Sequence, residues 1–226
     1  MTDFFDAVAG RLIVSAQAYP GEPMRDPRTM VAVAVSAVRG GAAAIRLQGL
    51  DDIRLGAEAL DVPVIGLWKD GKDGVFITPT LEHAVAVAAA GADVVALDGT
   101  RRDRPDGRTL AEVVKALRNE TDALVMADCG SAEDAIAAAE AGADIIGTTL
   151  AGYTGERPSG DGPDLDLIAE LRALALGPFL VAEGRIHTPE QARQAHEAGA
   201  DSVVVGTAIT HPQTITSWFA RAVEAR

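Results

Sequence analysis

The chain has 226 residues, 48% of them hydrophobic and only 4% aromatic, and its formal net charge is −13 at pH 7. This charge argues against nucleic acids and anionic membranes as partners, and it requires any phosphate site to be built from local groups. The single cysteine, Cys129, permits no internal disulfide and fits a reducing cytoplasm; we find no signal peptide and no segment with the roughly 20 apolar residues of a membrane span.

The hydrophobic pattern predicts alternating helices and strands along the whole chain. A first helix over about 3–9 is expected to plug one end of the fold. Strands are expected at about 12–17, 43–47, 62–68, 93–97, 123–127, 144–148, 178–182 and 202–206. Helices are expected at about 27–39, 50–60, 80–90, 109–118, 131–141, 164–174, 189–198 and 212–224. Segment 149–163 is long and rich in glycine, which is typical of a mobile cover over a site.

A recurring signature, Gly-Ala-Asp followed by a β-branched run, sets the architecture. It reads AGADVVAL at 90–97, AGADIIGT at 141–148 and AGADSVVV at 198–205, with a degenerate copy, GGAAAIRL, at 40–47. Each copy is typical of a helix that ends on a glycine and is followed by a buried strand. A period near 50 residues is about twice a strand-plus-helix unit. Four periods therefore predict a single-domain α/β fold over 1–226, a closed (β/α)8 TIM barrel.

Polar residues follow strands that are otherwise apolar. At or just past the strand ends lie Gln17, Arg46, Lys69, Asp98, Asp128, Thr148 or Thr149, Glu183 and Gly206, and seven of these eight positions are polar. The carboxyl ends of the strands in such a barrel meet at one mouth, where active sites lie. The alternative for each residue is a helix cap or a contact with water, but the whole set favours an active site.

Lys69 and Glu183 are the candidate catalytic residues. Each follows a run that should be buried, VIGLW before Lys69 and FLVA before Glu183. In an apolar wall the pKa of a lysine falls and that of a carboxyl group rises, which suits acid–base work near neutral pH. Two such groups could remove a proton from one face of a carbon and return one to the other. An ion pair between the two residues and a Schiff base on Lys69 remain alternatives.

The segments after the seventh and eighth strands favour a phosphate site. AEGRI at 182–186 and VVGTAI at 204–209 each place a glycine just beyond a strand. Backbone N–H groups at Gly184, Arg185, Gly206 and Thr207 could surround an anion, and the Arg185 guanidinium could add charged hydrogen bonds. The alternative is two tight turns that need glycine.

Further polar residues are candidates for substrate contacts. Arg46 would be costly to bury unpaired, so we expect it to contact substrate or to pair with an acid such as Asp128. Gln17 suits a sugar hydroxyl or an amide. The histidines do not cluster, no His, Asp and Glu spacing suggests a metal, and no dinucleotide or phosphate-loop motif is found, so we expect neither metal nor redox cofactor.

Seven segments together resemble the N-acetylmannosamine-6-phosphate 2-epimerase family. They are LIVSAQAYPGEPM (12–24), VFITPTLEH (75–83), GADVVALDGTRRDRP (91–105), LVMADCGSAEDA (124–135), GADIIGTTLAGYT (142–154), VAEGRIHTPEQA (181–192) and VVVGTAITHP (203–212). The resemblance implies a barrel of the ribulose-phosphate-binding type and interconversion of N-acetylmannosamine 6-phosphate and N-acetylglucosamine 6-phosphate in amino-sugar and sialic acid breakdown. It also implies that Lys69 and Glu183 are the proton-transfer pair and that Gln17, Arg46 and Asp128 contact the substrate.

The chain departs from the family pattern at three places. Lys-Asp-Gly-Lys at 69–72 replaces Lys-Xaa-Asp-Tyr, His211 stands where Arg is frequent, and Leu47-Gln48 stands where small residues or Asn are common. These changes flank the pocket and bear on the exact sugar phosphate. The remaining alternatives are a Schiff-base lyase or synthase, an isomerase of another sugar phosphate, and a non-catalytic sugar-phosphate sensor.

The last expected helix has an apolar face, ITSWFARAV. This face could pack on the barrel or could form the interface of a homodimer.

Overall fold

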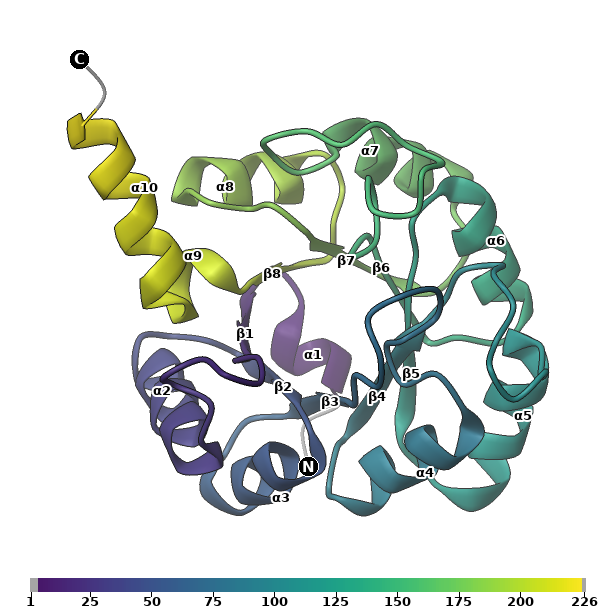
Figure 1. The fold of residues 1–226 in the computed structure, drawn as a ribbon. Helices are drawn as coiled ribbons and strands as arrows, with labels where there is room; N and C mark the ends of the chain where they lie inside the picture. The colour runs from purple at the N-terminus through teal and green to yellow at the C-terminus, as the bar shows by residue number, and fades with distance from the viewer. Residues whose placement is uncertain (1–3, 225–226) are drawn as a thin grey trace.

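The computed structural model describes residues 4–224, and eight parallel strands close into a barrel in the order β1 to β8 (Figure 1). The strands are β1 (Leu12–Ala16), β2 (Ala44–Gln48), β3 (Val64–Leu67), β4 (Val94–Asp98), β5 (Leu124–Asp128), β6 (Ile145–Gly147), β7 (Phe179–Glu183) and β8 (Ser202–Val205). The predicted (β/α)8 fold is confirmed. Within residues 4–224, no helix combines the length and apolar character needed to cross a bilayer.

One helix precedes the first strand, and the others follow the strands in the chain. They are α1 (Phe4–Val8), α2 (Pro27–Arg39), α3 (Leu50–Ala59), α4 (Leu81–Ala89), α5 (Leu110–Glu120), α6 (Ala132–Glu140), α7 (Leu165–Leu174), α8 (Pro189–Glu197), α9 (Thr207–Thr210) and α10 (Pro212–Glu224). Ser131 caps α6, and Thr188 forms a capping box on α8. The short helix α9 was not among the predicted elements.

The Gly-Ala-Asp repeat has a structural basis. The glycines take a left-handed backbone that ends the preceding helix: Gly41, Gly91, Gly142 and Gly199 have φ of 107°, 105°, 90° and 118°. In the three copies that contain an aspartate, its carboxylate then accepts a hydrogen bond from a backbone N–H near the start of the preceding strand. The bonds run from Val64 N to Asp93, from Val125 N to Asp144 and from Leu180 N to Asp201, each at 2.8 Å. The repeat therefore joins neighbouring strands at the amino end of the barrel.

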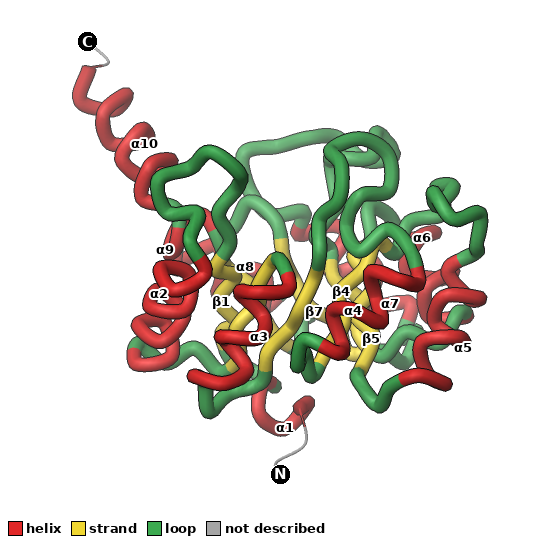
Figure 2. Tube along the Cα trace, turned by 60° about the horizontal axis from the view of Figure 1, so that its bottom comes forward, coloured by secondary structure: helices red, strands yellow, loops and turns green. Residues whose placement is uncertain are grey.

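Helix α1 closes the amino end of the barrel, as the sequence predicts. Phe4 and Val8 are buried and belong to one apolar cluster with inward-facing residues such as Ile13, Ile65 and Met126. Figure 2 shows α1 on the side opposite the long loops that rise from the other end. The floor is thus sealed by apolar contacts, and the opposite mouth is left for polar groups.

Helix α10 contacts the barrel of its own chain at Trp218, whose ring centroid lies 4.7 Å from that of His187, but much of its apolar surface stays uncovered. It projects away from the body of the molecule (Figures 1 and 2), and none of its described residues is buried. Phe219 is 69% exposed and Val223 83% exposed. Beside α10, an apolar groove on the barrel wall is lined by Leu12, Val33 and Ile209. Of the two sequence-based alternatives for this helix, packing on its own barrel is therefore observed in part, at Trp218, while Phe219 and Val223 stay exposed.

Candidate active site

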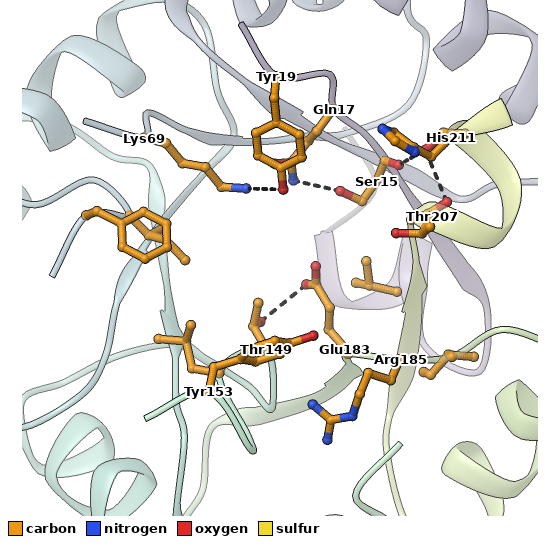
Figure 3. Close-up of a pocket in the computed structure, with 18 of the residues that line it drawn as sticks. Ser15, Gln17, Tyr19, Lys69, Thr149, Tyr153, Glu183, Arg185, Thr207 and His211 are labelled. Atoms are coloured by element: carbon orange, nitrogen blue, oxygen red, sulfur yellow. Dashed lines mark hydrogen bonds between the residues drawn. The ribbon is translucent and has the colours of Figure 1, made fainter. Parts of the chain in front are cut away.

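A cavity of about 520 Å³ opens at the carboxyl ends of the strands (Figure 3). Most of the sequence-predicted site residues line it, namely Gln17, Lys69, Glu183, Gly184, Arg185, Gly206 and Thr207. Arg46 and Asp128 do not line it, because they are almost completely buried beneath it. Barrel closure brings these positions together, since parallel strands all end at the same rim.

Lys69 enters the cavity from just beyond β3. The chain folds back there, because Lys69 pairs with Ile77 in an isolated antiparallel bridge and Trp68 N donates to Thr78 Oγ1 at 3.1 Å. Lys69 is half-buried, so it does not sit in the fully apolar wall that the sequence suggested. Its ammonium donates to the Tyr19 hydroxyl at 3.2 Å and lies 4.8 Å from the centre of the Tyr19 ring.

Glu183 belongs to a buried ion network under the cavity. Arg46 is 1% exposed and binds Asp128 with two hydrogen bonds, at 2.5 and 3.1 Å, and it also donates to the Glu183 carboxylate. Thr149 Oγ1 donates to Asp128 at 2.6 Å. The expected pairing of Arg46 with an acid is therefore present. Within residues 4–224, Glu183 forms its ion pair with Arg46, and the alternative pair with Lys69 is not formed.

Charges in this network set the protonation of its members. Burial raises the pKa of Glu183 above its ordinary value, and Asp128 adds to the rise, although Arg46 and, more weakly, Lys69 act in the opposite direction. For Arg46, burial alone would lower the pKa, but Asp128 and Glu183 outweigh it and raise the pKa. The guanidinium therefore stays charged, while the Glu183 carboxyl group is brought nearer to the pH range in which it can exchange a proton.

The turns after β7 and β8 place backbone beside the cavity. Gly184 has φ +114°, and Gly206 lies so close to β1 that a Cβ would stand 3.3 Å from Ser15 Cβ. The Arg185 side chain is used differently from the expectation, because its guanidinium donates to Ala151 O at 2.6 Å and to a second carbonyl of the β6–α7 loop. Figure 3 shows this guanidinium turned away from the centre of the cavity. Here the side chain holds the loop.

Two buried polar atoms on the cavity wall have no hydrogen-bond partner in the part of the chain that the structure describes. Gln17 Oε1 and Thr154 Oγ1 have no hydrogen bond among the described residues. Buried polar atoms are normally satisfied, so such atoms on a cavity wall point to a ligand that supplies the missing bonds. The sequence singled out Gln17 by its place at a strand end, but it gave no signal for Thr154, which lies within the β6–α7 loop.

The sequence reasoning missed Tyr19, and it placed His211 beside the pocket only through the comparison with the family pattern. Both line the cavity, and His211 Nε2 lies 2.9 Å from Glu22 Oε1 across the barrel rim. The local sequence offers one signal for these two residues: each lies in the segment that follows a strand end, a few residues further along the chain. Among residues 4–224, no group of three or more His, Cys, Asp or Glu is arranged to hold a metal ion.

Comparisons with known proteins agree with the resemblance found in the sequence. Residues 30–225 match the family described as "Putative N-acetylmannosamine-6-phosphate epimerase". A "Putative N-acetylmannosamine-6-phosphate 2-epimerase" of Cutibacterium acnes is 58% identical over 97% of this chain and 98% of its own, and one of Corynebacterium glutamicum is 48% identical over 93% and 92%. The solved N-acetylmannosamine-6-phosphate 2-epimerase of Clostridium perfringens superposes with a TM-score of 0.93, at 38% identity over 97% and 96% of the chains. This chain belongs to the N-acetylmannosamine-6-phosphate epimerase family.

Proposed function

We propose that the protein interconverts N-acetylmannosamine 6-phosphate and N-acetylglucosamine 6-phosphate by inverting carbon C2. The observation that carries the proposal is that Lys69, just beyond β3, and Glu183, at the end of β7, extend into one cavity from different walls (Figure 3). An ammonium or amine and a carboxyl group on two sides of one carbon are what an inversion by proton transfer requires.

The chemistry follows from the structure of the sugar. In the ring-opened form C1 is an aldehyde, and only then is the proton on the adjacent C2 acidic. One residue takes this proton, the C–H electron pair moves toward O1, and an enolate forms. The other residue then donates a proton to the opposite face of C2, and the electrons return from O1. The step exchanges protons only, so no net oxidation or reduction occurs. We assign Lys69 and Glu183 to the two faces.

The surrounding residues support this chemistry. The buried Arg46 charge stabilises the carboxylates beneath the cavity and orients Glu183. Gln17 Oε1, which has no hydrogen-bond partner within residues 4–224, is placed to accept a hydrogen bond from a sugar hydroxyl or the acetamido N–H. We assign the phosphate to the backbone at Gly184 and Gly206, at the rim position where barrels commonly bind phosphate.

The test is a proton NMR assay with N-acetylmannosamine 6-phosphate in deuterated water. We expect appearance of the epimer with deuterium at C2, and loss of both signals in Lys69→Ala and in Glu183→Ala. Exchange that persists unchanged in both variants would refute the assignment of the proton-transfer pair. Borohydride trapping of substrate on Lys69 would instead indicate Schiff-base chemistry.

We further propose that the protein is a homodimer in which α10 of each copy packs into the groove of the other. The support is that α10 presents Phe219 and Val223 to solvent, while the apolar groove lined by Leu12, Val33 and Ile209 stays uncovered. Light scattering should give twice the chain mass, and Phe219→Glu should shift the protein toward monomer. A monomer for the unsubstituted protein would refute this.

The acidic charge and the single cysteine support the remaining expectations. A net charge of −13 favours a small phosphosugar bound at a local site over nucleic acid or membrane, and the buried free Cys129 fits a cytoplasmic location.

A further inference from the structure

Lys69 depends on one residue for its position. The Tyr19 contact, through both the hydroxyl and the ring face, is the only polar contact of the Lys69 ammonium among residues 4–224. Lysine has a long side chain with about 2 kcal/mol of rotamer entropy. A single contact can therefore determine which rotamer is populated and where the ammonium lies. Figure 3 shows Tyr19 beside Lys69 on the wall opposite Glu183.

Tyr19 itself is held from outside the cavity. It is 50% exposed, on the loop between β1 and α2, so packing alone does not fix it. The Glu22 carboxylate accepts from Tyr19 N at 2.8 Å, and Glu22 N donates back to Tyr19 O at 3.0 Å. The other carboxylate oxygen of Glu22 lies 2.9 Å from His211 Nε2, and His211 Nδ1 lies 2.7 Å from Thr214 Oγ1. We name the Glu22–His211 pair the clasp.

The clasp joins the first βα loop to the amino end of α10. Burial would raise the pKa of Glu22, but hydrogen bonds from Tyr19 N and His211 outweigh it and lower the pKa. The carboxylate is therefore charged at neutral pH and can hold both partners at once. A continuous set of contacts then runs from α10 through Glu22 and Tyr19 to Lys69.

We propose that Tyr19 is a positioning residue for Lys69 and that the Glu22–His211 clasp holds Tyr19 in place. The inference rests on the proposed function, in which Lys69 exchanges a proton with C2. Proton transfer requires the nitrogen within hydrogen-bond reach of the reacting group, and small displacements are costly. Tyr19 is not needed to bind the sugar in this scheme, so its loss acts on turnover more than on affinity.

The first test compares the two tyrosines of this cavity. Tyr19→Phe removes the oxygen that Lys69 contacts. Tyr153→Phe is the matched control: the Tyr153 ring faces Arg185, and its hydroxyl makes no hydrogen bond among the described residues. For Tyr19→Phe we expect kcat to fall about tenfold, with KM within about twofold, as for the loss of one hydrogen bond made to the acting group. The loss for Tyr153→Phe should be clearly smaller. Thermal melting checks that both variants stay folded.

The second test is a double-mutant cycle on the clasp. Glu22→Ala should lower kcat severalfold when Tyr19 is present and should have no further effect in the Tyr19→Ala background, because the clasp acts through Tyr19. Effects that multiply independently would overturn the role of the clasp. An unchanged kcat in Tyr19→Phe, or equal losses for both tyrosines, would overturn the positioning role while the unsubstituted enzyme still turns over. Absence of turnover in the unsubstituted enzyme would refute the proposed function and this inference with it.

Discussion

Replacing Arg46 by methionine is expected to destabilise the fold by about 3 kcal/mol at neutral pH, although methionine matches much of the arginine's volume. Arg46 is 1% exposed and is the ion-pair partner of both Asp128 and Glu183. Removing one member of a buried ion pair typically costs about 3 to 5 kcal/mol, because a charge stays buried without its partner. We take the lower value because Thr149 still donates to Asp128 and because Glu183 can become neutral by binding a proton.

The pH dependence gives this prediction its sharpest form. Glu183 already has a raised pKa, and Arg46 is the main group that lowers it, so the substitution moves the pKa further up. A carboxyl group whose pKa is higher in the folded than in the unfolded state contributes stability below its unfolded pKa and loses that contribution as pH rises through the folded pKa. The deficit of Arg46→Met relative to the unsubstituted protein should therefore shrink from about pH 8 to about pH 5.

Urea unfolding followed by circular dichroism measures this difference at both pH values. The control is Arg54→Met, which removes the exposed pair of Arg54 with Asp51, bonded at 2.8 Å. For the control we expect a change within about 0.5 kcal/mol at either pH. A loss below about 1 kcal/mol for Arg46→Met, or a deficit that grows on acidification, would refute the account of the buried network.

Three further outcomes are expected. Gly206→Ala should raise KM for the phosphorylated sugar severalfold with a smaller change in kcat, because its Cβ would stand 3.3 Å from Ser15 Cβ beside the assigned phosphate position. Steady-state kinetics check this, and an unchanged KM would contradict it. Asp93→Ala should cost about 1 kcal/mol of unfolding free energy, because Val64 N loses its acceptor; an equal stability in urea would argue against the role given to the repeat. Arg185→Met should speed proteolytic cleavage of the β6–α7 loop, because two loop carbonyls lose their donor; cleavage at the unsubstituted rate would show that other contacts hold the loop.

Much of the fold follows from local patterns. The Gly-Ala-Asp copies mark helix ends, and the buried runs after them mark strands, so the period near 50 residues predicts the closed barrel that the structure shows. Strand-end positions such as Lys69, Glu183 and Gln17 follow from the same pattern, because closure of a parallel barrel brings every carboxyl end to one rim. These features depend on residues close together in the chain, and that is why the sequence alone determined them.

Other features depend on contacts between distant segments. Arg46 and Glu183 are 137 residues apart and Glu22 and His211 are 189 apart, yet each pair is in direct contact. The partner of Arg185 and the outward course of α10 also depend on tertiary structure. Several partners are available to each in the unfolded chain, and closure of the barrel determines which of them lie within reach. The sequence determined which groups reach the mouth of the barrel, and the three-dimensional packing decided which of them touch, because hydrogen bonds between loops carry no periodic signal along the chain.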